Sequence, residues 1–288
     1  DGSSKFGKNN KWAGFPSAAI AWKISNETFM KNITAISDLK LRFSYGETGN
    51  QGIGSYASLA KLSVYNYPFG GASQTGLAND LASGPANEEL QWETTRSYNL
   101  GLDLGMFNNR LNLKVEVYKK ITEDLLQNIT IPSSSGFQTK LVNSGSVQNK
   151  GLEVSLDGTV LKVKDFEWKS NFNIAFNRNK ILSLSPDVRE QYARNISTGD
   201  APFIQIVGKP IGALYGYVED GYYDNEAEVR SDPAYSGLGN AIILRTIGEV
   251  KYKNLDSDPV SISQTDRTFI GDVFKPNETS IFNKPSAK

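Results

Sequence analysis

The sequence contains no cysteine and no histidine among its 288 residues. The missing cysteines exclude disulfides, thiol nucleophiles and cysteine-based metal sites, and the missing histidines remove the commonest general base and metal ligand. No apolar run approaches the roughly 18 consecutive residues of a transmembrane helix. Lysine plus arginine and aspartate plus glutamate balance at 31 each, so the charge gives no indication of nucleic acid binding. Hydrolase and metalloenzyme chemistry are disfavoured, although carboxylate-only mechanisms survive.

What the sequence has instead is a strict alternation of apolar and polar residues, clearest between residues 96 and 120. Every second residue there is apolar or aromatic, first in one run and then, after a turn at residues 107–109, in another: Tyr98, Leu100, Leu102, Leu104 and Met106, then Leu111, Leu113, Val115 and Val117. Side chains alternate across a strand, so this period predicts a sheet with one apolar and one polar face. Each run is about ten residues long, close to the roughly 9–11 that a tilted strand needs to cross a bilayer.

Further strands of the same kind are predicted at residues 15–24, 39–45, 152–157 and 166–177. Helical signals are sparse, with single turns expected at residues 124–127 and 225–230. Short links, including the Asn108-Asn109 turn and residues 162–165, alternate with long polar links at residues 48–91, 123–149 and from 179 onward. Transmembrane β-barrels sort their connections in this way, with short periplasmic turns and long extracellular loops.

Aromatic residues mark both ends of the predicted strands. Tyr45 and Trp92 lie at the long-loop end, whereas Phe107, Phe166 and Trp168 lie at the short-turn end. Two such bands resemble the aromatic girdles at the two membrane interfaces. The alternative is that these residues cap the core of a soluble β-sandwich.

Several short motifs occur in a fixed order along the chain. They are DGSSKFGKNNKW at residues 1–12, FPS at 15–17, AWKIS at 21–25, LKLRFSYG at 39–46, TGNQ at 48–51, WETT at 92–95, NLGLD at 99–103, NKGLE at 149–153, GKPIG at 208–212, YGY at 215–217, DG at 220–221, DRT at 266–268 and IG at 270–271. In number, order and spacing this set resembles the SusC/RagA-type TonB-linked outer-membrane proteins, and it covers the C-terminal part of their barrel.

The resemblance implies an all-β fold, namely a portion of an antiparallel transmembrane β-barrel with long extracellular loops. It also implies a function: import of oligosaccharides or peptides across the cell outer membrane, energised through TonB, with a SusD-like surface lipoprotein acting as a lid. The partners implied are outer-membrane lipid, the lipoprotein, the substrate, and TonB through an N-terminal part that these residues do not match. No cofactor, metal or enzymatic activity is implied.

The resemblance divides the chain into a barrel portion at residues 1–271 and a divergent polar tail at residues 272–288, which is expected to be coil. In lipid, every backbone polar group needs an internal partner, so a transmembrane sheet must close into a barrel. The predicted strands are too few for a large barrel, so the barrel is expected to be incomplete as given. We therefore expect that this chain alone does not transport.

The barrel interpretation assigns the two faces of the strands. The apolar residues would face lipid. The polar residues expected to face the lumen are Lys40, Arg42, Asn112, Lys114, Glu116, Glu153, Asp157, Glu167, Lys169 and Asn171. For these charges, contact with solvent or with a plug is favoured over contact with substrate.

Ligand or partner contacts are expected in the long loops, two of which are rich in tyrosine. Tyrosine offers a flat apolar face and a polar tip, which suits stacking on sugars or packing against a protein lid. The candidate residues are Tyr65 and Tyr67 in one loop and Tyr215, Tyr217, Tyr222 and Tyr223 in another. For any single tyrosine, packing of the loop itself is the competing explanation.

Two other functions stay open on the residues alone. A soluble β-sandwich could bind glycans through the tyrosine-rich loops, and a β scaffold could carry a carboxylate-based glycosidase.

Asn254, Asp256 and Asp258 have the alternate spacing of a calcium loop, with Asp266 following. Pro259 stands where the loop needs glycine, and Thr265 where it needs a bidentate acid, so a plain polar turn is favoured.

Overall fold

The computed structural model describes residues 1–80, 83–185, 190–193, 203–235, 237–256, 262, 264–272 and 277–287. The chain divides into two compact units, Asp1–Arg189 with Pro276–Lys288, and Glu190–Lys275. Each unit is described by itself.

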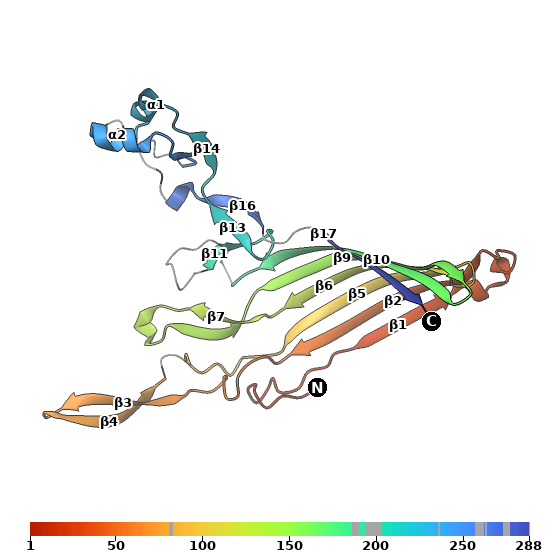
Figure 1. Ribbon diagram of the computed structural model, residues 1–288. Helices are drawn as coiled ribbons and strands as arrows, with labels where there is room; N and C mark the ends of the chain where they lie inside the picture. Colours follow the sequence, from red (N-terminus) through yellow and green to blue (C-terminus); the bar gives the residue numbers. More distant parts are fainter. Residues whose placement is uncertain are drawn as a thin grey trace. The chain divides into compact units, whose positions relative to one another are not determined.

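The first unit is built on one antiparallel sheet of seven strands in the order β1-β2-β5-β6-β9-β10-β17 (Figure 1). The strands are β1 (Ser17–Lys23), β2 (Ile36–Asn50), β5 (Glu93–Met106), β6 (Leu111–Glu123), β9 (Ser146–Val163), β10 (Phe166–Ser183) and β17 (Asn277–Ala287). The five strands from β2 to β10 have 13 to 18 residues each. They are longer than the predicted runs and long enough to cross a bilayer.

The connections alternate between short and long, as predicted. The turn from β5 to β6 holds Phe107, Asn108 and Asn109 at positive φ, and the turn from β9 to β10 holds Lys164 at positive φ. Asparagine tolerates this backbone conformation better than most residues, which explains the tight turn at Asn108-Asn109. The link from β1 to β2 carries two short 3₁₀ turns, η1 (Ile24–Asn26) and η2 (Thr28–Met30).

Two of the long connections contain hairpins of their own. They are formed by β3 (Leu62–Phe69) with β4 (Ala72–Asn79), and by β7 (Leu126–Thr130) with β8 (Thr139–Asn143), the latter closed over η3 (Ser133–Ser135). The helical turn predicted at residues 124–127 is wrong. Asp124 has φ of 57° and the β7 strand begins at Leu126, because pairing with β8 overrides a weak local helix signal.

The sheet leaves its apolar face uncovered by the described residues. In register, Ile20, Phe43, Leu100, Val117, Leu152 and Phe176 form one row across six strands. Ile20 is 70% exposed, and Phe43, Leu100 and Val117 are 46–50% exposed. A β-sandwich would bury this row against a second sheet, so the exposure favours lipid as the neighbour of the apolar face.

The main buried cluster of the first unit lies at the long-loop end instead. It consists of Phe6, Ile53, Leu90 and Trp92, with Phe15 packed against it. The Trp92 ring centroid is 5.4 Å from those of Phe6 and Phe15, and Trp92 is 7% exposed. The prediction that Trp92 belongs to an interface girdle is therefore wrong, since the N-terminal segment covers the ring.

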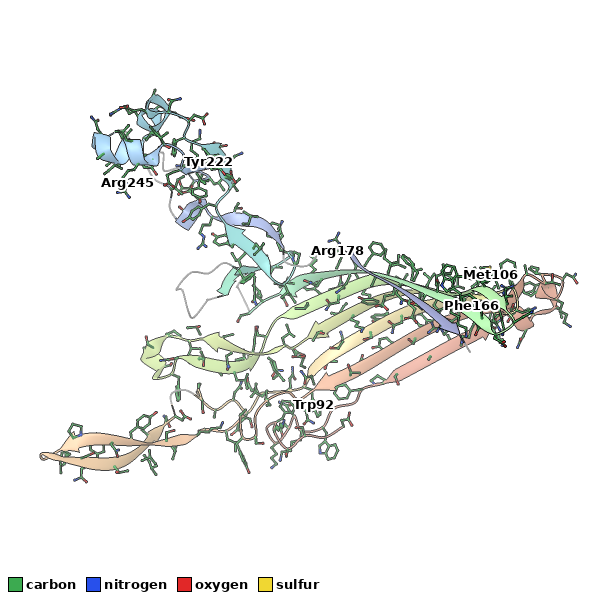
Figure 2. The ribbon with its side chains drawn as sticks, in the orientation of Figure 1. Trp92, Met106, Phe166, Arg178, Tyr222 and Arg245 are labelled. Carbon is green, nitrogen blue, oxygen red and sulfur yellow. The ribbon has the colours of Figure 1, made fainter. Side chains whose placement is uncertain are left out.

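The other predicted girdle residues are exposed or half-buried. Phe107, Phe166 and Trp168 at the short-turn end are 57%, 41% and 38% exposed. Figure 2 labels Met106 at the end of β5 and Phe166 at the start of β10, both at this end of the sheet. At the long-loop end Tyr45 and Tyr98 pair across β2 and β5, with ring centroids 5.1 Å apart.

Residues 277–287 form a strand, whereas the sequence predicts polar coil for the tail that contains them. Strand β17 pairs antiparallel with β10 over Phe166–Phe176 and places Pro285 opposite Trp168. The edge of β10 presents unpaired backbone groups that a neighbouring segment can satisfy. Proline is compatible with an edge strand because its missing N–H need not face a partner.

The second unit contains small sheets and two short helices. One sheet has the order β11-β12-β13-β16, from β11 (Glu190–Ala193), β12 (Phe203–Ile206), β13 (Ala213–Gly216) and β16 (Thr268–Asp272), and another pairs β14 (Glu219–Tyr222) with β15 (Val250–Tyr252). The helices are α1 (Glu226–Ser231) and α2 (Asn240–Thr246), and η4 (Gln264–Asp266) is a 3₁₀ turn. The predicted helical turn at residues 225–230 is confirmed, with Asn225 as N-cap accepting from the backbone N–H of Glu228. Among the described residues, no helix is long and apolar enough to span a membrane.

Candidate functional site

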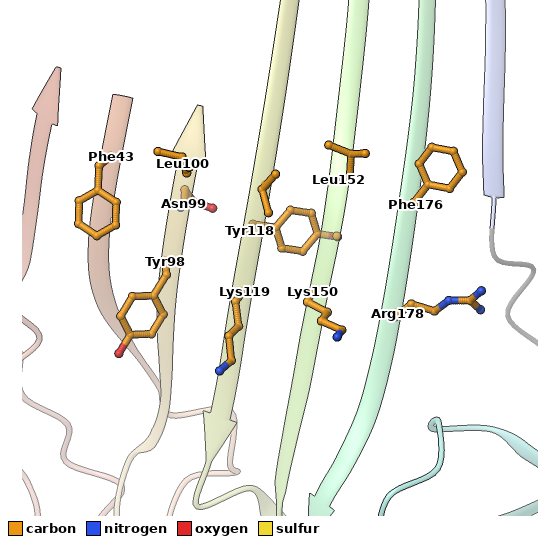
Figure 3. A pocket seen from close by; sticks show the side chains of 12 residues that line it. Phe43, Tyr98, Asn99, Leu100, Tyr118, Lys119, Lys150, Leu152, Phe176 and Arg178 are labelled. Carbon is orange, nitrogen blue, oxygen red and sulfur yellow. The ribbon is translucent and has the colours of Figure 1, made fainter. Parts of the chain in front are cut away.

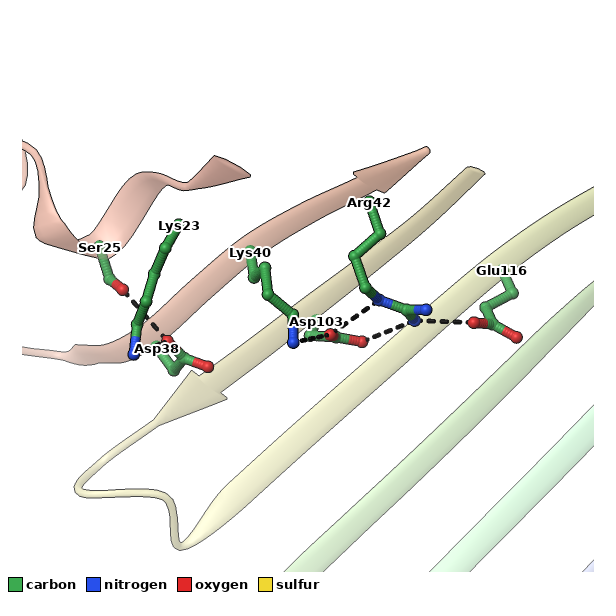
Figure 4. A network of polar contacts seen from close by, with 7 residues as sticks. All are labelled: Lys23, Ser25, Asp38, Lys40, Arg42, Asp103 and Glu116. Atoms are coloured by element: carbon green, nitrogen blue, oxygen red, sulfur yellow. Dashed lines mark hydrogen bonds and ion pairs between the residues drawn. The ribbon is translucent and has the colours of Figure 1, made fainter. Parts of the chain in front are cut away.

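The polar face of the sheet carries a charge network across β2, β5 and β6 (Figure 4). Arg42 donates from Nε and Nη2 to the two carboxylate oxygens of Asp103, each at 2.9 Å, and from Nη2 to Glu116 Oε1 at 2.7 Å. Lys40 Nζ lies 3.1 Å from Asp103 Oδ2. Two cations and two anions balance within this group, so the network needs no further ion.

Gly101 makes room for this network. Arg42 pairs with Gly101 in the register of β2 and β5. A Cβ on Gly101 would lie 2.8 Å from Nη2 and 2.9 Å from Cζ of Arg42. The bare glycine backbone therefore lets the guanidinium lie across β5 and reach Glu116 on β6.

The remaining predicted lumen residues share this face. Asn112, Asp157 and Asn171 stand in one row across β6, β9 and β10, and Asn171 donates a hydrogen bond to Asp157. Lys169 Nζ is 3.3 Å from Glu167. The sheet thus brings the predicted polar set together on one face, as the alternation requires.

Two features of this face depend on register across the strands. Asp103, the residue that joins Lys40 and Arg42, is missing from the predicted lumen set, although it alternates with Leu102 and Leu104. Glu116 and Glu153 stand directly opposite each other on β6 and β9. Arg42 offsets the repulsion of this pair by binding Glu116.

The candidate tyrosines of the first unit lie on an exposed hairpin. Tyr65 and Tyr67 on β3 are 39% and 49% exposed, and Phe69 on the same strand is 72% exposed. Leu62 and Val64, on the opposite face of β3, are 63% and 64% exposed. The β3–β4 hairpin therefore offers apolar side chains on both faces, an arrangement typical of contact surfaces.

The candidate tyrosines of the second unit divide into exposed and packed ones. Tyr215 and Tyr217 are half-buried, and both rings make cation–π contacts with the guanidinium of Arg267. The Cζ atom of Arg267 lies 5.3 Å from the Tyr215 ring centroid and 5.6 Å from that of Tyr217. The Tyr217 ring also packs against the Tyr252 ring in a tilted arrangement, with centroids 5.3 Å apart. Tyr222 is 55% exposed, which makes it the most accessible tyrosine of this group.

Tyr223 is the most deeply packed of the group. Its side chain is 6% exposed and forms a small core with Val229, Ile243 and Tyr235. Its hydroxyl donates to Asp232 Oδ2 at 2.6 Å. Burial and this hydrogen bond raise the pKa of Tyr223, so the phenol stays neutral. The competing explanation of loop packing therefore fits Tyr223.

The segment suspected of calcium binding is organised by a buried aspartate. Asp266 is fully buried, and its Oδ1 accepts hydrogen bonds from the backbone N–H groups of Leu255 at 2.6 Å and Asp256 at 3.2 Å. Asp258 lies outside the described residues. Within the part of the chain that the structure describes, no group of three acidic side chains is placed to hold a metal ion.

Comparison with known proteins agrees with this architecture. Residues 1–255 match the family model described as TonB dependent receptor-like, beta-barrel. The TonB-dependent receptor P26 of Formosa agariphila is 37% identical over 271 residues, covering 94% of this chain and 26% of that protein. The TonB-dependent receptor SusC of Bacteroides thetaiotaomicron is 33% identical over 284 residues, covering 89% of this chain and 28% of SusC. The chain spans about a quarter of the length of these relatives.

Comparison with solved structures indicates the same kind of protein. The chain is similar to the structure of the RagAB peptide transporter, with a TM-score of 0.77 and 29% identity over 100% of this chain and 29% of that one. The RagAB peptide importer in its closed-closed state gives a TM-score of 0.78 at the same identity and coverage. The chain therefore belongs to the TonB-dependent receptor-like β-barrel family and forms part of a barrel in the cell outer membrane.

Proposed function

We propose that the chain forms part of the wall of an outer-membrane importer that takes up oligosaccharides or peptides. The observation that carries the proposal is the division of the sheet into an exposed apolar face and a charged face that includes Lys40, Arg42 and Asp103. A barrel wall needs this division, because one face meets lipid and the other lines a polar lumen. The family match supports the same function.

Energy for import is proposed to come from TonB. The support for this is the family to which residues 1–255 belong. The contact with TonB is assigned to a part of the importer N-terminal to the matched region. The wall itself is proposed to have no enzymatic role, and its charges are proposed to keep the lumen wet and to contact a plug.

A SusD-like surface lipoprotein is proposed as the partner at the long-loop end. The support from this chain is the β3–β4 hairpin, where Tyr65 and Tyr67 stand with exposed aliphatic residues. Tyr215, Tyr217 and Tyr222 are proposed as a second contact region for ligand or partner. Tyr223 is left out of this surface because its ring is buried.

An uptake experiment tests the proposal. Cells that lack the gene are complemented with the intact wild-type protein or with a Tyr65→Ser/Tyr67→Ser variant, and uptake of labelled peptides and oligosaccharides is measured with and without TonB. The proposal expects TonB-dependent uptake of one substrate class, reduced several-fold by the tyrosine changes. Equal uptake in deleted and complemented cells for both substrate classes would contradict it.

A matched variant separates the hairpin from other tyrosines. Tyr56 is 71% exposed in the same long connection but lies outside the hairpin. Tyr56→Ser is therefore expected to leave uptake near the wild-type level. Loss of uptake in this variant as well would indicate a general effect of loop changes.

A further inference from the structure

One residue from each of five neighbouring strands stands in a single row at the long-loop end of the sheet. The register pairs Tyr45 with Tyr98, Tyr98 with Lys119, Lys119 with Lys150, and Lys150 with Arg178. Directly paired residues point to the same face, so this row belongs to the apolar face. Figure 3 shows the last four of these side chains in line across β5, β6, β9 and β10.

The three cations of this row, Lys119, Lys150 and Arg178, are here called the cationic row. All three side chains are exposed. Like charges that stand directly opposite each other on neighbouring strands repel and destabilise a sheet. The pairing of β6 with β9 and of β9 with β10 therefore does not explain these three residues, and a bound anion would offset their repulsion.

The nearest carboxylates on this face are already engaged. Further toward the long-loop end of the same face, Arg96 Nη1 lies 2.6 Å from Glu123 Oε2, and Arg96 Nε lies 3.5 Å from Glu47 Oε1. Among the described residues, no ion pair joins a carboxylate to Lys119, Lys150 or Arg178. The cationic row therefore faces outward with its charge uncompensated by this part of the protein.

A groove begins directly beside the cationic row. It has a volume of about 490 Å³ and its walls include Phe43, Leu100, Leu152 and Phe176 (Figure 3). Lys119, Lys150 and Arg178 line its rim. Apolar walls under a cationic rim match an amphiphile that has a hydrocarbon chain and an anionic head.

The level of the row in the membrane agrees with this match. The tyrosine pair Tyr45–Tyr98 occupies the same row, and tyrosines on a lipid-facing surface gather at the membrane interface. Lysine and arginine on the lipid face are unfavourable at the bilayer centre but tolerated near the interface. The cationic row therefore lies at the height of the lipid headgroups, and the groove below it lies at the height of the acyl chains.

We propose that the cationic row and its groove form a binding site for one anionic phosphate-bearing lipid of the outer leaflet. The phosphate is held between Lys119, Lys150 and Arg178, where the arginine can donate two parallel hydrogen bonds and the lysines act as point charges. An acyl chain of the same lipid packs along Phe43, Leu100 and Leu152. The site is on the lipid face and does not depend on the transported substrate.

Lipid binding to the intact protein tests the proposal. The protein is purified in a non-ionic detergent, and binding of phosphatidylglycerol and of phosphatidylcholine with the same acyl chains is measured by native mass spectrometry. The first phosphatidylglycerol is expected to bind about ten-fold more tightly than phosphatidylcholine, because only its headgroup carries net negative charge. The variant Lys119→Gln/Lys150→Gln/Arg178→Gln is expected to lose this preference.

A charge-matched control makes the result specific. Lys8→Gln/Lys11→Gln/Lys114→Gln removes the same charge from exposed lysines outside the cationic row and is expected to keep the preference. Arg178→Lys keeps the positive charge and is therefore expected to keep most of the preference for phosphatidylglycerol. A band shift on heating checks that each variant is a folded barrel.

Three outcomes would overturn the proposal. The first is equal binding of the two lipids by the wild-type protein. The second is loss of the preference in the control variant to the same extent as in the cationic-row variant. The third is complete displacement of the lipid by millimolar inorganic phosphate, which would mean that the site recognises free phosphate and that the groove contributes nothing.

Discussion

Arg42 and Asp103 form a two-pronged ion pair between neighbouring strands, with both N–H···O distances at 2.9 Å. The Arg42 side chain is 36% exposed and that of Asp103 is 17% exposed on the polar face, and Glu116 extends the pair to a third strand. A bidentate pair of this kind fixes the relative position of β2 and β5 as well as their charge balance.

The first prediction concerns the energy of this pair. In a double-mutant cycle of Arg42→Met and Asp103→Asn in the intact protein, the coupling energy is expected to be about 1 kcal/mol, because the pair is bidentate but partly open to solvent. Urea unfolding of the barrel in detergent micelles measures it. The single-pronged pair Lys169–Glu167 at 3.3 Å is the control, with an expected coupling below about 0.5 kcal/mol. Equal couplings would contradict the argument from geometry.

A second prediction tests the assignment of the two faces. Leu102 pairs with Leu41 and Val115 in the middle of the apolar face. Leu102→Arg is expected to destabilise the inserted barrel by roughly 2–4 kcal/mol, since it places a charge at the bilayer centre. Lys114→Ala on the polar face is expected to have little effect. The amount of heat-modifiable protein in the outer membrane is measured for both variants. Similar reductions in the two variants would contradict the assignment of the apolar face to lipid.

A third prediction concerns Gly151, which lies opposite Tyr118 in the register of β6 and β9. A Cβ at this position would lie 2.6 Å from the backbone oxygen of Phe176 and 2.6 Å from the Tyr118 ring. Gly151→Ala is therefore expected to cost about 1–3 kcal/mol, as overpacking does. Gly46→Ala is the matched control, because its nearest contact would be Ser17 Cβ at 3.6 Å. Unfolding midpoints that shift equally would show that glycine flexibility, not space, decides the result.

A fourth prediction concerns pH and the second unit. The hydrogen bond from Lys251 and that from the backbone of Asp224 lower the pKa of Glu228. Because the pKa of Glu228 is lowered, the Glu228–Lys251 pair stabilises the fold at pH values above the ordinary glutamate pKa. This stabilisation is lost as the pH falls through the lowered pKa of Glu228. The pKa of Lys251 is raised, chiefly by its hydrogen bond to Glu228, so its contribution disappears only in the alkaline range above the ordinary lysine value.

Hydrogen exchange of the peptide that contains α1, corrected for the intrinsic effect of pH, measures this dependence. Protection is expected to stay constant from neutral pH down through the ordinary glutamate range and to fall only at more acidic pH. Lys251→Met is expected to lower protection at neutral pH and to flatten the curve. Lys253→Met, which removes only a 3.8 Å contact with Asp220, should leave the curve unchanged. An unaltered curve in Lys251→Met would refute the assignment.

The wall of the barrel could be predicted from the sequence because each of its strands is amphipathic by itself. Leu100, Leu102 and Leu104 specify a face without reference to any neighbour. Two of the motifs that carry the family resemblance meet in the fold, because Phe6 near the N-terminus packs with Trp92 of the WETT motif in the buried cluster. The same contact explains the error over Trp92, since only the folded chain shows what covers it.

Features that depend on partners across strands could not be predicted. Asp103 becomes important because Lys40 and Arg42 stand on the next strand, and the cationic row exists only in the register that aligns Lys119, Lys150 and Arg178. Strand β17 is not predictable from its sequence, because its residues do not alternate and the strand forms by pairing with the free edge of β10. Of the candidate tyrosines, Tyr223 could not be separated from Tyr222 by sequence, although one is buried and the other exposed.

The strand order also has a consequence for how such a protein can diversify. From β1 to β10, every wall strand pairs with the wall strand that comes next along the chain. The β3–β4 and β7–β8 hairpins and the residues from Glu190 to Lys275 are inserted in the sequence between consecutive wall strands, at the three long connections. An insertion at such a place adds chain without changing a single cross-strand pair, and its entropic cost grows slowly with length. The long connections can therefore change in length and sequence during evolution while the pairing of the wall strands stays the same.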